Sequence, residues 1–254
     1  MRRLSWRWSC VALLSLAGMM MQSCADADAP LPAAHTKSSV LIIGDATVVT
    51  PQLANILNAM GHGLRDTLDV QLMVQPGWDL VDHYLAGLAP SVIRQGGWEY
   101  VVLQDAPIIS GDVRLLVETW AGKFRADVAA SGGRLAIFNP YAGVFSVDFT
   151  RSQSSIGAYD LIATSLAATP LRVGSSWAKA WSRDQTLPFF QADGVSPSTL
   201  ANYLSAMVIY SSLTGARVSD LPVGVRLAAG DSISFTPTVM AVMRAAAADA
   251  ITGK

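Results

Sequence analysis

The chain has 254 residues, of which 51% are hydrophobic and 15% charged, so it can bury one sizeable core and is too apolar for a disordered chain. Its net charge is −1, and no run of lysine or arginine follows residue 7, which argues against a basic patch that binds nucleic acid. Both cysteines, Cys10 and Cys24, lie in or beside the N-terminal segment. The rest of the chain therefore has no internal disulfide, cysteine-based zinc site or cysteine nucleophile.

Residues 1–23 have the features of a secretory signal peptide, with three arginines before an apolar stretch that is too short to span a membrane. Small residues just before Cys24 resemble the lipobox of bacterial lipoproteins. This resemblance implies secretion across the inner membrane and a lipid anchor on Cys24 that holds the protein at the outer membrane or facing the periplasm. Cleavage by the ordinary signal peptidase at Ala25-Asp26-Ala27 is the alternative.

The remaining chain divides into a flexible tether at residues 24–38, rich in Ala, Asp, Pro, Ser and Thr, and one folded domain at 39–254. Short apolar runs in the domain alternate with stretches of helical periodicity. We predict strands at 40–43, 70–74, 100–103, 135–138 and 171–173. We predict helices at 51–60, 80–93 with an interruption or end near Pro90, 113–130, 154–167, 197–214 and 237–251.

This alternation of strands and helices predicts an α/β fold with three layers. A parallel sheet of about five strands carries helices on both of its faces. Ligands bind such sheets beyond the carboxyl ends of the strands, so the loops after the strands are the first candidates for a site.

Four blocks at these positions resemble the SGNH/GDSL hydrolase superfamily, in a branch of secreted bacterial proteins. They begin at Gly44-Asp45-Ala46-Thr47, at Gly77, at Gly97 and at Asp193, and the third block ends in Gln104-Asp105. Their order and spacing are kept over roughly residues 39–217, which is more specific than any single block. The resemblance implies the flavodoxin-like SGNH fold.

In that superfamily a serine in the first block attacks the ester, and a histidine in the last block is the general base, oriented by an aspartate. The oxyanion hole combines the backbone N–H of the serine, the N–H of the second-block glycine and a side-chain amide of the third block. Here Ala46 stands at the serine position and Ser196 at the histidine position, so only Asp193 of the triad remains. Alanine offers no nucleophile and serine is no base near neutral pH.

A change from serine to alanine leaves the backbone N–H in place. We therefore expect Ala46, Gly77 and Gln104 to remain as donors for a carbonyl, acetyl or carboxylate oxygen. Thr47, Trp78 and Asp105 are further ligand-binding candidates beside them, and Trp78 could form the floor of a sugar-binding groove.

Each candidate also has a structural interpretation. Ala46 could be a small residue at a strand end, Asp193 could support a turn, and Ser196 before Pro197 could be a helix N-cap. For His83 a packing role is favoured over a role as replacement base.

Two further interpretations concern a nucleophile and a metal. Thr47 is a conceivable substitute nucleophile, but no base is recognisable near it. Gly230-Asp231-Ser232 spells the family's nucleophile triplet but precedes the cap of the last helix, so we reject it. We expect no metal and no cofactor, because the acids form no dense ligand run.

The leading hypothesis is an envelope-anchored pseudoenzyme that binds an acyl-, acetyl- or carbohydrate-type ligand, or that serves as an accessory module. Acetylated polysaccharide or an envelope glycan is the expected partner, by analogy with related esterases. An active esterase with a non-standard nucleophile and a structural interaction protein of an envelope complex are the alternatives.

Overall fold

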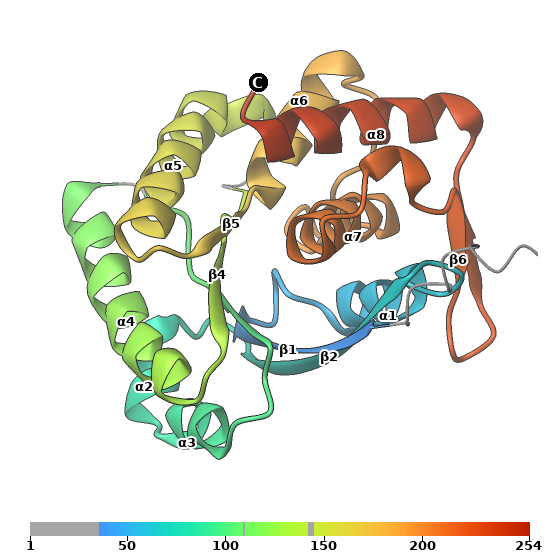
Figure 1. The fold of residues 1–254 in the computed structure, drawn as a ribbon. Helices are drawn as coiled ribbons and strands as arrows, with labels where there is room; N and C mark the ends of the chain where they lie inside the picture. The colour runs from blue at the N-terminus through green and yellow to red at the C-terminus, as the bar shows by residue number, and fades with distance from the viewer. Residues whose placement is uncertain (1–35, 109, 142–144) are drawn as a thin grey trace, which may run out of the picture. The chain divides into compact units, whose positions relative to one another are not determined.

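The structure is a computed structural model that describes residues 36–108, 110–141 and 145–254, without the side chains of residues 145–153 (Figure 1). The predicted signal peptide, Cys24 and the tether as far as residue 35 lie outside the described residues. The first strand begins at Thr36, so residues 36–38 belong to the domain and not to the tether.

A five-stranded parallel sheet forms the centre of the domain. Its strands lie in the order β2 (Asp66–Gln75), β1 (Thr36–Asp45), β3 (Tyr100–Gln104), β4 (Arg134–Phe138) and β5 (Thr169–Leu171). The predicted fold class and strand number are thereby confirmed. β2 is an edge strand, and the order reverses between β1 and β3, which makes their carboxyl ends the switch point of the sheet.

The strands bury side chains on both faces because successive residues point to opposite sides. In β1, Val40 and Ile42 pack into one core cluster, and Leu41 and Ile43 into the other. The first cluster lies under α1 (Pro51–Met60), α6 (Val173–Arg183), α7 (Thr199–Thr214) and α8 (Pro237–Thr252). The second lies under α2 (Leu80–Leu85), α3 (Leu88–Gln95), α4 (Gly111–Ala130) and α5 (Phe145–Ser165). Each fully buried Val, Leu, Ile or Phe side chain contributes about 1.5–3 kcal/mol of transfer free energy.

Helix α7 is buried on nearly every side, because it lies between the sheet and α8 and packs against α1 and α6 (Figure 1). This position explains its sequence, in which apolar residues follow one another without a polar face.

Several predicted elements differ from those of the structure. The helix predicted at 154–167 is α5, which begins at Phe145 and ends at Ser165. The predicted helix at 80–93 is two helices, α2 and α3, and the break lies at Gly87, whose φ of +77° suits glycine, while Pro90 sits in the first turn of α3. The fifth strand lies two residues earlier than predicted, at Thr169–Leu171. Helix α6, which begins at Val173, was not predicted.

A short antiparallel hairpin also escaped prediction. It consists of β6 (Gly224–Arg226) and β7 (Ser232–Ser234), and it follows a 3₁₀ turn, η1 (Val218–Asp220). The triplet Gly230-Asp231-Ser232 lies at the turn and second strand of this hairpin. Thr236 caps α8 and Pro237 is its first residue, as the sequence indicates.

Among the described helices, none is long and apolar enough to cross a membrane.

Candidate functional site

The first, second and third blocks meet at the switch point of the sheet, and Asp45 joins them. Its Oδ1 accepts hydrogen bonds from the N–H of Thr47 (2.8 Å) and the N–H of Gly77 (3.0 Å). Its own N–H donates to Oε1 of the buried Gln104 (2.7 Å). The loops after β1, β2 and β3 are thus held together by one aspartate.

The three donors of the predicted oxyanion hole are each paired inside the protein. The N–H of Ala46 donates to the carbonyl of Gln75 (3.1 Å), and the N–H of Gly77 to the Asp45 carboxylate. The Nε2 of Gln104 donates to the carbonyl of Asp105 (2.7 Å). The structure places the three residues at one end of the sheet, and the backbone donors of Ala46 and Gly77 are directed to acceptors of the protein and not to a common position for a substrate oxygen.

The two remaining triad positions form a local turn. The Ser196 hydroxyl donates to Oδ2 of Asp193 (2.6 Å), and the N–H groups of Val195 and Ser196 both donate to Oδ1 (2.9 Å each). The hydrogen bond from Ser196, followed by those from the two backbone N–H groups, lowers the pKa of the exposed Asp193 carboxyl. Asp193 therefore supports this turn, which is the structural interpretation that the sequence offered.

The suggestion that Ser196 caps the following helix is wrong. The helix starts two residues later than predicted, and Ser198 is its N-cap, with Oγ accepting from the N–H of Ala201 (3.2 Å). The cause lies at Pro197, whose backbone forms an isolated antiparallel bridge with Phe190 and so cannot be the first helical residue.

Little space remains between the Thr47 loop and the Ser196 loop. Between them the cavity volume is about 30 Å³, which holds one or two water molecules and no ester substrate. Aromatic and aliphatic side chains fill the rest: Val48, Phe138, Tyr141, Val173, Trp177, Phe190, Val195 and Pro197. Thr47 faces this small cavity, and no histidine is among the described residues that line it.

Asp105 serves the start of α2 and does not face a ligand. It is buried, and its two oxygens accept from the N–H of Leu80 (3.0 Å) and of Ala106 (2.6 Å). Burial raises the pKa of Asp105 to about 6, with a smaller contribution from the charges of Asp79 and Asp82, and the two backbone donors oppose this shift. Asp79 and Asp82 form a capping box at the same helix start.

His83 is buried, in agreement with the packing role favoured from the sequence. One ring nitrogen, Nε2, lies 3.0 Å from the carbonyl of Gly44, and the ring meets the Trp78 indole edge-to-face at 5.0 Å between centroids. Burial lowers the pKa of His83, which outweighs the opposing effects of the Gly44 hydrogen bond and the nearby Asp82, Asp79 and Asp45. The imidazole is therefore neutral at neutral pH.

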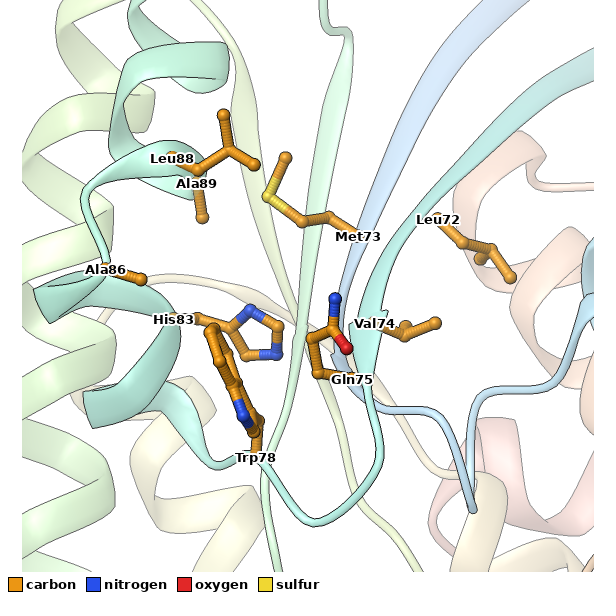
Figure 2. A pocket seen from close by; sticks show the side chains of 9 residues that line it. All are labelled: Leu72, Met73, Val74, Gln75, Trp78, His83, Ala86, Leu88 and Ala89. Carbon is orange, nitrogen blue, oxygen red and sulfur yellow. The ribbon is translucent and has the colours of Figure 1, made fainter.

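His83 and Trp78 also line a larger pocket that the sequence did not predict (Figure 2). Its volume is about 480 Å³, within the range of small-molecule sites. It lies beside the edge strand β2, on the side of α2 and α3, and shares no lining residue with the small cavity. Its walls are Leu72, Met73, Val74, Gln75, Trp78, His83, Ala86, Leu88 and Ala89.

The described residues contain no group of three or more histidine, cysteine, aspartate or glutamate side chains that could hold a metal ion.

Solved structures resemble this chain although no protein-family model and no curated sequence matches it. A DUF4886 family protein from Bacteroides uniformis superposes with a TM-score of 0.66 at 15% identity, over 85% of this chain and 95% of its own. A protein from Slackia heliotrinireducens, described as a candidate SGNH hydrolase, gives 0.56 at 17% identity, over 70% of this chain and 100% of its own. A lipase/acylhydrolase from Enterococcus faecalis gives 0.51 at 15% identity, over 73% of this chain and 97% of its own. The fold of this chain is therefore that of the SGNH-type hydrolases.

Sequence reasoning missed two features of the site. The sequence shows Asp45 only as part of the first block, although an acid at the carboxyl end of a central strand is well placed to bind N–H groups of neighbouring loops. The pocket beside β2 was missed because the sequence does not reveal which strand lies at the edge of the sheet.

Proposed function

We propose that this chain is a non-hydrolytic SGNH-fold protein that acts by binding a ligand at the bacterial cell envelope. The observation that carries the proposal is the pairing of Asp193 with Ser196, opposite a loop whose nucleophile position is Ala46. A serine hydrolase needs a nucleophilic hydroxyl, a base that is hydrogen-bonded to it and an acid that orients the base. The nucleophile and the base are absent at these positions.

The donor side supports the same conclusion. The backbone N–H groups of Ala46 and Gly77 already donate to protein acceptors, as does one of the two N–H groups of the Gln104 amide. A tetrahedral intermediate would therefore first have to displace the two backbone hydrogen bonds. The cavity of about 30 Å³ between the loops is too small for an ester with its alcohol.

Envelope location is the second part of the proposal and comes from the sequence of the leader, with Cys24 as the anchored residue. A secreted relative of esterases would meet acetylated polysaccharide or envelope glycan there, and a sugar or acyl group is the ligand class that we propose. An accessory role within an envelope complex is compatible with such binding.

The test is a hydrolysis assay on the purified mature protein, with p-nitrophenyl acetate and acetylated xylan as substrates. A fluorophosphonate probe is applied in parallel, with an active SGNH esterase as positive control. We expect neither turnover nor labelling. Turnover that disappears when a single residue such as Thr47 or Ser196 is changed, or a probe adduct at either residue, would refute the proposal in favour of an active esterase.

A further inference from the structure

The pocket beside β2 is lined on one side by residues of this strand and on the other side by residues at the end of α2 and the start of α3. Met73 and Gln75 point toward α2 and α3, whereas Leu72 and Val74 point to the other side of the strand (Figure 2). Ala86, Leu88 and Ala89 form the opposite wall (Figure 2). β2 is the edge strand of the sheet, so one side of the strand that lines the pocket pairs with no other strand of the sheet.

That free side offers backbone hydrogen-bonding groups. The N–H of Val70 donates to Oδ1 of Asn58 (2.8 Å), so Val70 directs its backbone away from β1. Alternation along a strand gives Leu72 and Val74 the same direction. Within the described part of the chain, no hydrogen-bond partner is found for the outward N–H and C=O of these two residues, and both line the pocket.

Trp78 supplies a fixed aromatic surface at one end of the pocket. Its side chain is 36% exposed, and its ring is held by the edge-to-face contact with His83. The turn before it is tight: the N–H of Trp78 donates to the carbonyl of Gln75 (3.3 Å), and Gly77 has a φ of +73°. A held indole with an accessible face is suited to stack on a flat or ring-shaped ligand at little entropic loss.

His83 supplies a hydrogen-bond acceptor to the pocket. A carbonyl oxygen only accepts, so the contact with Gly44 places the proton of the neutral ring on Nε2. Nδ1 is then an acceptor with a lone pair, and it has no partner among the described residues, although the side chain is 2% exposed and lines the pocket. Nδ1 is not among the fully buried side-chain atoms without a partner, so its lone pair is accessible from the pocket and can accept from a ligand hydroxyl.

The pocket discriminates against charge. No lysine, arginine, aspartate or glutamate is among the described residues that line it, so an anionic ligand finds no cation there. Asp79, Asp82 and Asp45 all lie close enough to His83 to affect its charge, which further disfavours an anion. The other walls are apolar apart from Gln75, whose amide can donate and accept.

We propose that this pocket binds a neutral, hydroxyl-bearing ring compound, which stacks on Trp78 and donates a hydrogen bond to Nδ1 of His83. Further hydroxyls would pair with Gln75 and with the free edge of β2. The inference rests on the proposed binding function and moves the binding site from the closed triad region to the edge of the sheet. A sugar ring with an apolar substituent has the required chemistry.

The probe is phenyl β-D-glucopyranoside, titrated into the full mature chain and followed by calorimetry and by Trp fluorescence, with benzoate as a charged ring of similar size. Ala86→Trp adds a large side chain at an exposed position of the pocket wall, and Ala126→Trp adds the same side chain at an exposed position of α4 as the matched control. Trp78→Ala removes the stacking surface. We expect wild type and Ala126→Trp to bind the glucoside and not benzoate, and we expect Ala86→Trp and Trp78→Ala to bind it about tenfold more weakly or not at all.

Three results would overturn the inference: no binding of the glucoside to folded wild type, equal binding of benzoate, or binding unaffected in both pocket variants. The esterase assay is a separate measurement. If the glucoside does not bind and no hydrolysis is seen, this pocket assignment is wrong and the non-hydrolytic proposal stands. If the protein hydrolyses esters and still binds the glucoside, the non-hydrolytic proposal is wrong and the pocket assignment stands.

Discussion

Ser196 donates its hydroxyl to Asp193 across 2.6 Å, and the same carboxylate also accepts the N–H of Ser196 and of Val195. The aspartate of the last block is thus fully engaged by its own loop. A histidine at position 196 would replace only the hydroxyl donor, because the two backbone donors remain. The aspartate–histidine pair of a triad could therefore be rebuilt by substitution. Whether activity would follow depends on the donors of the oxyanion hole.

The double variant Ala46→Ser with Ser196→His is expected to remain inactive. From the sequence alone, one would expect this pair of changes to restore an esterase. In the structure, however, the backbone N–H groups of Ala46 and Gly77 donate to Gln75 and Asp45, and one of the two N–H groups of the Gln104 amide donates to Asp105. Loss of one oxyanion-hole donor lowers kcat by about 10²–10³, so with both backbone donors engaged elsewhere we expect no rate above buffer.

The measurement is p-nitrophenyl acetate hydrolysis by the two single variants and the double variant, with thermal unfolding as the control for folding. A double variant that hydrolyses the ester much faster than the product of the single effects would show that the donors can be released. It would also mean that the small cavity opens on substrate binding.

The first four strands were predictable because each contains a short apolar run that is followed by glycine or a polar residue, as at 40–43 before Gly44, whereas β5 (Thr169–Leu171) has no such run. Helix α6 was not, since Val173–Arg183 mixes glycine, serine and tryptophan, and it is held by packing against α7 and α8. The break at Gly87 was misplaced to Pro90, because proline is compatible with the first turn of a helix and only the backbone shows which residue adopts a positive φ.

The site was predictable only in part. Block order and spacing place Ala46, Gly77 and Gln104 at one end of the sheet, and the structure has them there. Which acceptors their N–H groups meet depends on loop conformations of a few residues, and the role of Asp45 follows only from those conformations. The pocket at Trp78 depends on strand order, which the sequence pattern does not contain.

Replacement of Cys24 tests the envelope assignment. When the full precursor is expressed in a bacterium with alkyne-palmitate, we expect the wild type to be labelled and to fractionate with membranes, and Cys24→Ala to lose both properties. Cys10→Ala is the matched control, because that residue lies inside the predicted signal peptide and should leave labelling unchanged. An unlabelled wild-type protein that begins just after Ala27 would instead indicate the ordinary signal peptidase.

Gly44→Ala should destabilise the domain at the point where β1 meets Gln104. A Cβ at residue 44 would lie 2.4 Å from Oε1 of Gln104 and 3.0 Å from its carbonyl oxygen. Because Gln104 is buried and hydrogen-bonded at both ends of its amide, it cannot move aside, and we expect a loss of about 1–3 kcal/mol. Gly157→Ala in helix α5 is the control: apart from its chain neighbours and the helix backbone, no atom of the described residues lies within 4 Å of the added carbon, so a gain of about 0.5–1 kcal/mol is expected. Urea unfolding of both variants measures the difference, and equal stabilities would contradict the packing argument.

Asp105→Asn should change how stability depends on pH. The folded state raises the pKa of Asp105 from 3.8 to about 6, so folded protein holds this proton more tightly than unfolded protein does. The contribution of Asp105 to the free energy of unfolding is therefore fully present below about pH 4 and is lost as pH rises to about 6, by roughly 3 kcal/mol for a shift of this size. Asparagine cannot titrate, and it accepts from only one of the N–H groups of Leu80 and Ala106, which costs about 1 kcal/mol at every pH. The wild type should thus be the more stable protein at pH 4, and the variant should equal or exceed it at pH 7. Urea unfolding of both proteins at several pH values between 4 and 7 checks this, and parallel stability curves over that range would show that Asp105 stays ionised in the fold.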